Sequence, residues 1–338
     1  YNSHSGERGI FNREAAKNTV AKYGHRDPNF EFGTNPCSEI ILRPYQFCNL
    51  TEVVVRHDDT KETLLRKVRL AAILGTIQAT FTKFPYLRKV WQRNTEEERL
   101  LGVSLTGIYD NQLTCKQGEK LNELLSTLRE TARTTNKEFA DLLGIPVSAA
   151  ITCVKPSGTV SQLVDSASGI HPRHSKYYIR RVRGDKKDPI SQFLVSQGVP
   201  NEPCVYKPDN TIVFSFPQRA PDGITRADVT PISHLELWLT YQRSYTEHKP
   251  SITVSVEEKD WPTVGAWVWE HFDELSGVSF LPYDGGTYRQ APYEECSEDE
   301  YNELKSKMPV LNWELFLEET DNVEGAQMLA CVSGVCEI

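Results

Sequence analysis

The sequence predicts a mixed α/β fold built around a mainly parallel sheet. The chain has 338 residues, of which 39% are hydrophobic, and this is enough for a sizeable buried core. Segments with strand-like and helix-like patterns alternate along it, which is the order that builds βα units. Eight cysteines are too few for a disulfide scaffold in a chain of this length, so the core itself must hold the fold.

The first half of the chain contains two strong helix patterns. The opening up to Pro36 is expected to be loop-rich, and residues 40–55 have a pattern closer to strand than to helix. Residues 58–60 are typical of a helix cap, and apolar residues at helical spacing follow from Leu64 to Leu74. A second helix is expected over 119–143, because Gly144 and Pro146 follow as stop signals.

The second half alternates shorter elements. Residues 149–154 resemble a buried strand, and the PSGT sequence at 156–159 forms the turn into the next helix. The further predicted elements are a helix over 232–247, a strand over 251–256, a helix over 260–275 and a strand over 278–282. The chain turns acidic beyond Glu294 and becomes a tail of small residues after Thr320.

Charge and hydropathy exclude two classes of partner. The net charge of −8 and the pI near 5.6 argue against a general nucleic-acid binder, which needs clustered Lys and Arg. No apolar run approaches the roughly 18 residues that cross a bilayer, and no signal-peptide pattern is present, so we expect no membrane partner and a cytoplasmic location. Because the chain begins at Tyr1, we expect it to be truncated or processed.

The densest chemistry lies in NPCSEI, residues 35–40, followed by Cys48. A thiyl radical at Cys37 can abstract a ribose hydrogen atom, because the S–H bond that forms and the activated C–H bond that breaks are of similar strength. Glu39 is suitably spaced for a general base, and the Asn35 amide can both donate to and accept from ribose hydroxyls. Taken one at a time, these residues are also explained as a buried thiol, a solvated carboxylate and a turn residue. Their combination favours catalysis.

A second candidate site is the PSGT turn. Free backbone N–H groups and the helix dipole attract an anion where a strand leads into a helix through a glycine. The predicted phosphate site consists of Ser157, Gly158, Thr159, Val160 and Ser161. An ordinary N-cap turn is the alternative.

The other cysteines and two histidines complete the inventory. Cys331 and Cys336 lie within eight residues of the end, where a mobile segment is suited to thiol exchange, although two unrelated thiols remain the alternative. No metal site is predicted, because His171 and His174 lack partnering cysteines and resemble loop histidines. Packing is expected for the remaining cysteines, which are Cys115, Cys153, Cys204 and Cys296.

Together these motifs resemble the catalytic chain of ribonucleotide reductases. The pattern Asn35-Pro36-Cys37-x-Glu39 is similar to that family's finger-loop signature. The resemblance extends over almost the whole chain, through SGERGIFN, PSGTVSQLVDSASGIHP, FLPYDGGTYRQAPYE and the terminal cysteine pair. It implies that residues 1–295 are the C-terminal part of a ten-stranded α/β barrel whose finger loop carries the radical cysteine. Residues 296–338 would be a helical segment and a flexible redox tail.

The resemblance also implies roles and partners. The activity would be reduction of ribonucleoside di- or triphosphates to deoxyribonucleotides for DNA replication. Cys48 would be one half of the active-site dithiol, the PSGT turn would hold substrate phosphates, and Cys331 and Cys336 would carry electrons from thioredoxin or a similar donor. The family places the other active-site cysteine on an earlier strand, and no cysteine precedes Cys37 here. An N-terminal part of the reductase is therefore an expected partner.

Two stretches, VSFLPYDGGTYRQAPYE and SGIHPRHS, are similar in sequence to the adenosylcobalamin-dependent class of this family. This resemblance implies that cofactor. Iron-dependent members use two adjacent tyrosines late in the barrel, whereas Tyr283 and Tyr288 are not adjacent, and Tyr177 and Tyr178 lie in the wrong place. An iron-dependent reductase, a glycyl-radical-type lyase and a non-catalytic nucleotide-binding fragment remain the alternatives. The sequence leaves open whether the substrate is a diphosphate or a triphosphate, which effectors act and which oligomer forms.

Overall fold

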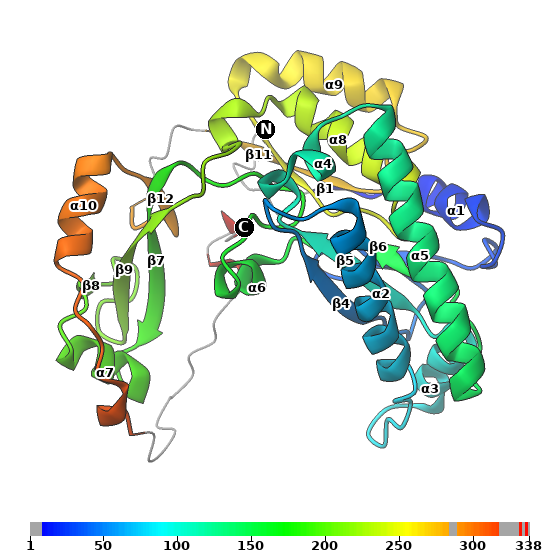
Figure 1. The fold of residues 1–338 in the computed structure, drawn as a ribbon, viewed down its shortest axis with the longest axis horizontal. Helices are drawn as coiled ribbons and strands as arrows, with labels where there is room; N and C mark the ends of the chain where they lie inside the picture. Colours follow the sequence, from blue (N-terminus) through cyan, green and yellow to red (C-terminus); the bar gives the residue numbers. More distant parts are fainter. Residues whose placement is uncertain (1–8, 284–288, 318–330, 333–334, 337–338) are drawn as a thin grey trace. The chain divides into compact units, whose positions relative to one another are not determined.

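The computed structural model describes residues 9–283, 289–317, 331–332 and 335–336. The chain divides into two compact units (Figure 1). The first unit contains Tyr1–Arg173 and Asp228–Pro282, and the second contains His174–Ala227 and Tyr283–Glu337. Each unit has its own sheet, and the residues of the candidate finger loop all lie in the first.

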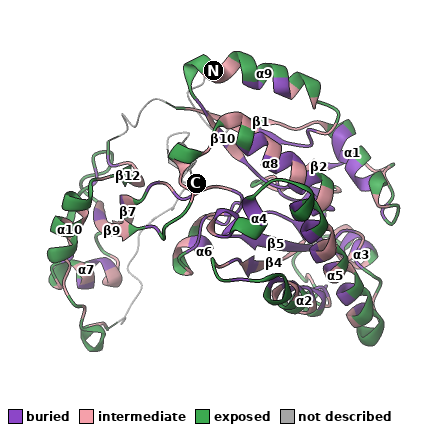
Figure 2. Cartoon of the chain, turned by 45° about the horizontal axis from the view of Figure 1, so that its top comes forward, coloured by how far each residue is buried: buried purple, intermediate pink, exposed green. Residues whose placement is uncertain are grey.

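The centre of the first unit is a parallel sheet of three strands in the order β4-β5-β6. These strands are β4 (Asn49–Val54), β5 (Leu101–Thr106) and β6 (Thr152–Cys153). All of β5 is buried, as expected for the central strand of a parallel sheet covered by helices. Figure 2 shows this buried centre beneath the more exposed outer helices.

Helices follow the strands of this sheet. Thr60 caps α2 with a capping box, and the left-handed Gly144 (φ 66°) ends α5. Asn136 on α5 donates to the hydroxyl oxygen of Thr76 on α2 at 2.9 Å, so the two long helices are joined by a buried polar contact. The helical segments between β4 and β7 are α2 (Lys61–Gln78), α3 (Lys89–Glu98), η1 (Ile108–Asp110), α4 (Gln112–Cys115), α5 (Glu119–Leu143) and α6 (Gly158–Leu163).

A second sheet of the first unit has the order β1-β11-β10. Strands β10 and β11 are parallel, and β1 is antiparallel to β11. A bridge between Val154 and Pro250 connects the segment after β6 to the segment before β10. The elements of this region are β1 (Gly9–Ile10), α1 (Arg13–Lys22), α8 (Pro231–Ser244), β10 (Thr253–Val256), η3 (Glu258–Asp260), α9 (Trp261–Glu270) and β11 (Val278–Pro282).

The second unit contains an antiparallel sheet in the order β12-β7-β9-β8. Its long central pair, β7 and β9, is registered from Tyr177↔Arg219 to Asp185↔Thr211. The elements of this unit are β7 (Tyr177–Asp185), α7 (Pro189–Ser196), β8 (Asn201–Pro203), β9 (Thr211–Arg219), β12 (Tyr293–Glu295), α10 (Glu298–Ser306), η4 (Trp313–Leu315), β13 (Cys331–Val332) and β14 (Val335–Cys336), with η2 (Arg226–Asp228) at its boundary.

The mixed α/β class is confirmed, and several elements match their predicted positions. Helix α5 and strand β11 have the predicted bounds, and α2 begins directly after its predicted cap. The expected division of the chain at residue 295 stays a prediction. Within the described residues, no helix combines the length and hydrophobicity that crossing a membrane would require.

Other predictions were wrong. The opening is not simply loop-rich, because Asn12 caps α1 through hydrogen bonds from Glu14 N and Ala15 N. The expected strand over 40–55 is two short strands, β3 (Ile41–Leu42) and β4, because the intervening chain turns at Tyr45, where φ is 58°. Helices α8 and α9 end earlier than expected, and a mainly parallel sheet does not describe the second unit.

Candidate active site

The candidate finger loop is the connection between β2 (Gly33–Thr34) and β3, which pair as a short antiparallel ladder. Asn35 closes this loop, since its Oδ1 accepts a hydrogen bond from Ile40 N at 3.0 Å and its carbonyl accepts one from Ser38 N at 2.9 Å. Ser38 takes the left-handed conformation with φ 67°. Asn35 therefore braces the loop through its oxygen, and its predicted contact with ribose stays a prediction.

Cys37 stands exposed in this loop. Its carbonyl oxygen accepts a hydrogen bond from Ser251 Oγ at 2.5 Å, which fixes the backbone behind the thiol. Partial desolvation of the thiol, followed by the Glu39 charge, raises the pKa of Cys37, while the Lys155 ammonium opposes that rise by charge and hydrogen bonding. The loop thus presents a predominantly protonated thiol.

Glu39 lies two residues further on and is completely buried. One carboxylate oxygen, Oε1, accepts a hydrogen bond from Lys155 Nζ at 3.2 Å. The other, Oε2, is buried and has no hydrogen-bond partner among the residues that the structure describes. A buried carboxylate oxygen normally has a partner, so Oε2 is the atom of this loop available to a bound hydroxyl group.

Cys48 lies at the entrance to β4 and is half-buried. Desolvation first, and the charge of Glu39 second, raise the pKa of its thiol far above the ordinary value. Cys153 on β6 is fully buried, and the causes that raise its thiol pKa are burial, then Glu39, then Cys48. The structure therefore gathers Cys37, Cys48 and Cys153 within electrostatic reach of one carboxylate. Burial of Cys153 agrees with its predicted packing role.

The segment preceding β10, residues 249–251, binds the candidate finger loop through hydrogen bonds. Lys249 N donates to Glu39 O at 3.2 Å, and Lys249 Nζ donates to Ser38 Oγ at 2.7 Å. The Lys249 side chain is fully buried, and this burial lowers the pKa of its ammonium group to about 7, against the opposing charge of Glu39. Because Ser251 also binds Cys37, this segment contacts three consecutive loop residues, Cys37, Ser38 and Glu39. Sequence reasoning missed it, because no motif marks it.

The PSGT turn does lead into a helix, α6, as predicted. Ser157 takes the left-handed conformation with φ 57°, and its hydroxyl donates to Glu52 Oε1 on β4. Ser161 Oγ donates to Gly158 O at 2.9 Å. These two hydroxyls therefore bind protein groups, whereas Thr159 and Val160 at the start of the helix are exposed. Burial raises the pKa of Glu52, and hydrogen bonds from Ser157 and Thr106 oppose that rise.

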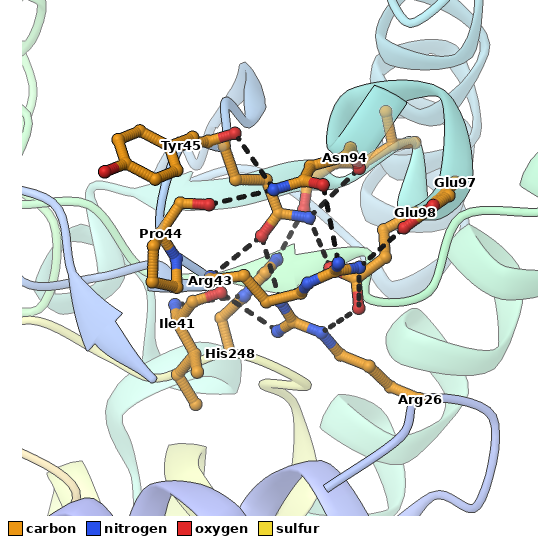
Figure 3. A network of polar contacts seen from close by, with 11 residues as sticks. Arg26, Ile41, Arg43, Pro44, Tyr45, Asn94, Glu97, Glu98 and His248 are labelled. Carbon is orange, nitrogen blue, oxygen red and sulfur yellow. Dashed lines mark hydrogen bonds and ion pairs between the residues drawn. The ribbon is translucent and has the colours of Figure 1, made fainter. Parts of the chain in front are cut away.

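A buried polar network supports β3 on the side of Arg26 (Figure 3). Arg26 makes a two-pronged ion pair with Glu98, at 3.1 and 2.9 Å, and also donates to Ile41 O at 2.9 Å. Burial lowers the pKa of His248 to about 3, so its ring is neutral. His248 Nδ1 then accepts from Ile41 N at 3.3 Å, and Nε2 donates to Leu101 O at 2.9 Å. The strand that ends the loop is thereby fixed to β5.

The remaining candidate residues are a loop histidine, two strand tyrosines and residues outside the described part. His171 is a loop histidine as predicted, accepting from Thr253 N at 3.0 Å through Nε2, and burial lowers its pKa to about 4. In the described ranges, no group of three or more His, Cys, Asp or Glu side chains is arranged to hold a metal. Tyr177 and Tyr178 lie on β7 as ordinary strand residues. Residues 5–8 of SGERGIFN and residues 284–288, including Tyr288, lie outside the described part.

The C-terminal cysteines are described only through their backbone. Cys331 and Cys336 are register partners in the antiparallel pair of β13 and β14. Directly opposed residues in such a pair have Cα atoms about 4.5–5.5 Å apart, which is within the range that a disulfide spans.

Comparison with known proteins adds sequence relatives and fold neighbours. No family model matches the chain. The adenosylcobalamin-dependent ribonucleoside-triphosphate reductase of Lactobacillus acidophilus is 28% identical over 99% of this chain and 49% of its own length. A probable enzyme of the same name from Dictyostelium discoideum is 31% identical over 92% of this chain and 41% of its own length, and the Euglena gracilis enzyme is 30% identical over 91% and 42%. The chain spans about half the length of the curated relatives it matches.

Solved structures show the same fold. A B12-dependent (class II) ribonucleotide reductase superposes with a TM-score of 0.70 at 22% identity, covering 82% of this chain and 42% of that one. The Actinobacillus ureae class Id ribonucleotide reductase α subunit superposes with a TM-score of 0.58 at 16% identity, covering 82% and 58%. The fold of the chain is therefore similar to that of these two ribonucleotide reductases. The sequence relatives named above are adenosylcobalamin-dependent ribonucleoside-triphosphate reductases, which confirms the resemblance drawn from the motifs.

Proposed function

We propose that this chain is the C-terminal part of an adenosylcobalamin-dependent ribonucleotide reductase and supplies its radical cysteine and general base. The observation that carries the proposal is the pairing, on one loop, of the exposed Cys37 thiol with the buried Glu39 carboxylate, whose Oε2 has no partner among the described residues. The similarity to curated reductases over nearly the whole chain supports the same assignment.

The residues have distinct roles in this proposal. A thiyl radical at Cys37 removes a ribose hydrogen atom, and Glu39 Oε2 accepts the 3′-hydroxyl proton. The 2′-hydroxyl takes a proton from the active-site dithiol and leaves as water. Cys48 supplies reducing electrons together with a second cysteine from the N-terminal part. Asn35 contacts the ribose in addition to bracing the loop. When bound, adenosylcobalamin supplies the radical chemistry that oxidises Cys37, and the exposure of this thiol fits approach of that group from outside the loop.

We further propose that the two sheets of the first unit are part of a ten-stranded α/β barrel that the N-terminal part completes. The parallel pairs in β4-β5-β6 and β10-β11 support this, and so does a chain length of about half that of the relatives. Residues 1–295 would form the barrel part and 296–338 the helical segment and redox tail, in a cytoplasmic enzyme.

The substrate and electron donor follow from two further features. Ser157, Gly158, Thr159, Val160 and Ser161 would hold the substrate phosphates, mainly through backbone N–H groups at the start of α6, because the two serine hydroxyls already bind protein groups. Cys331 and Cys336 would pass electrons from thioredoxin to the active-site disulfide by thiol exchange, which their facing backbone positions support.

The test is Cys37→Ser in the reductase assembled from this chain and its N-terminal part, with adenosylcobalamin and a dithiol. We expect deoxynucleotide formation to fall to background while nucleotide binding, measured by equilibrium dialysis, changes less than about twofold, because a hydroxyl cannot replace the thiyl radical. Cys296→Ser, a half-buried cysteine of the second unit, is the matched control and should retain activity. Turnover by Cys37→Ser comparable to that of the control would refute the proposal.

A further inference from the structure

We propose that Lys155 is a positioning residue of this reaction, which holds one oxygen of the Glu39 carboxylate and leaves the other to accept a proton from the substrate hydroxyl. The inference rests on the proposed function and adds a residue to it. The supporting observation is that the two oxygens of the Glu39 carboxylate differ. Lys155 Nζ lies 3.2 Å from Oε1, whereas Oε2 has no partner among the described residues.

The backbone of Lys155 is fixed before its side chain reaches the loop. Lys155 N donates to Ser104 Oγ on β5 at 2.8 Å, directly after β6. Its carbonyl oxygen is so close to Gly169, which has φ +57°, that a Cβ there would lie at 2.3 Å. These two contacts anchor the lysine to the sheet on one side and to the loop after α6 on the other. The backbone from which the Lys155 side chain extends to Glu39 is therefore fixed.

The charge of Lys155 matches what the buried carboxylate requires. Glu39 is wholly buried, and an ionised carboxylate in such a place needs a countercharge. The Lys155 side chain is 32% exposed, so its ammonium group keeps partial access to water. Burial acts to lower the pKa of Lys155, but the charges of Glu39 and Cys37 outweigh that effect and raise it, so Lys155 stays protonated throughout the neutral range.

Lys155 also reaches the second reacting group of the loop. The charge of Lys155 and its hydrogen bond to Cys37 oppose the rise in the Cys37 pKa that desolvation causes. The other titratable groups that face this cluster are Lys249, Glu52, Cys48 and Cys153. Of the two lysines, Lys249 binds the loop through the Ser38 hydroxyl, so Lys155 is the one that binds the carboxylate itself.

The proton step stays balanced with Lys155 as a spectator. The O–H bond of the substrate hydroxyl breaks, a new O–H bond forms at Glu39 Oε2, and Lys155 keeps all three of its protons. Fixing Oε1 also orients Oε2, because the two oxygens share one rigid carboxylate plane. Loss of the ammonium group would let the carboxylate rotate, so that Oε2 would no longer be held toward the substrate hydroxyl.

The experiment compares Lys155→Met, Lys155→Arg and the control Lys137→Met, which changes an exposed lysine on α5. In the assembled reductase we expect Lys155→Met to lower kcat by roughly 10- to 100-fold, which is less than the roughly 10²- to 10⁴-fold that a positioned base contributes, because Glu39 itself is still present. KM should stay within about twofold of the parent value, because Lys155 contacts Glu39 and Cys37 and acts through them. Lys155→Arg, which keeps the charge, should recover most of the lost kcat, and Lys137→Met should match the parent protein.

A second readout needs neither cofactor nor turnover. Alkylation of Cys37 by iodoacetamide, followed on its peptide by mass spectrometry, should be roughly tenfold slower at about pH 8.5 in Lys155→Met, because the thiolate loses its countercharge. An unchanged kcat together with unchanged alkylation would overturn the role of Lys155. If the parent protein reduces no nucleotide, the proposed function fails, and the alkylation rates still decide whether Lys155 acts on the loop.

Discussion

Replacing Lys249 by methionine should make the stability of the protein less dependent on pH. Lys249 is 0% exposed, and burial lowers its pKa from 10.5 to about 7 although the Glu39 charge opposes the shift. The unfolded chain therefore binds a proton at this residue between pH 7 and 10.5, where the folded protein does not. Since stability rises with pH wherever the unfolded state binds more protons, Lys249 makes the parent protein more stable as pH increases through this window.

The size of the effect follows from the shift. Each unit of pKa difference corresponds to about 1.4 kcal/mol, so the free energy of unfolding should gain about 2.5 kcal/mol from this residue between about pH 7.5 and 9.5. Methionine has a similar length and no proton to lose, so its variant lacks that gain. At pH 7 and below, the variant should be more stable than the parent by a few kcal/mol, less about 1 kcal/mol for the lost hydrogen bond to Ser38.

The assay is urea unfolding of parent and variant at several pH values within this window. Groups distant from Lys249 titrate equally in both proteins, so the pH dependence of the difference between the two free energies of unfolding comes from Lys249 and the groups beside it. Lys137→Met supplies the baseline, because that lysine is exposed and should give a difference independent of pH. A difference for Lys249→Met that stays flat across the window would refute the reasoning and show that Lys249 remains charged in the folded protein.

Three further perturbations test other parts of the structure. Cys331→Ser with Cys336→Ser should abolish thioredoxin-driven turnover, yet leave a single turnover by pre-reduced enzyme and partial rescue by dithiothreitol; equal steady-state rates with thioredoxin would contradict the shuttle. Arg26→Met should lower the free energy of unfolding by about 3 kcal/mol, because the buried Glu98 loses its close ion pair and keeps, among the described residues, only Arg43, at 3.9 Å, as a charged partner, and adding Glu98→Met should recover part of that loss in urea unfolding. Gly169→Ala should cost at least about 2 kcal/mol, since φ is +57° and Lys155 O is in the way, and a neutral result in thermal unfolding would contradict the observed turn.

Local patterns predicted the long helices and the loop chemistry. Helix α5 carries its apolar spacing and its stop signal within one stretch, ending at Leu143 before the left-handed Gly144, so no distant contact was needed to define it. Cys37, Glu39 and Cys48 lie within twelve residues of one another, and their spacing alone marked them. In both features, residues that are neighbours in the sequence are also neighbours in space.

Features made by distant contacts escaped prediction. The antiparallel partners in the second unit pair Tyr177 with Arg219 across a long connection, and neither strand shows that partner in its own sequence. Lys155 contacts Glu39 across a separation of 116 residues, and Lys249 contacts Ser38 across 211. A lone lysine in either place has no motif, so only the fold could reveal that both reach one loop.

The two lysines also explain why the loop can hold a buried carboxylate without carrying excess positive charge. Lys155 keeps 32% of its side chain exposed and has Glu39 as a direct partner, and its pKa is raised. Lys249 is wholly buried and donates a hydrogen bond to the uncharged Ser38 hydroxyl, and burial lowers its pKa to about 7. Above neutral pH one ammonium group therefore faces one carboxylate, and the cluster is balanced. Below that pH Lys249 takes up a proton beside the loop, and the added positive charge should favour thiolate formation at Cys37. Cys37 alkylation in the parent protein and in Lys249→Met should consequently differ most below about pH 7 and converge at higher pH, whereas a constant ratio would mean that Lys249 does not change its charge.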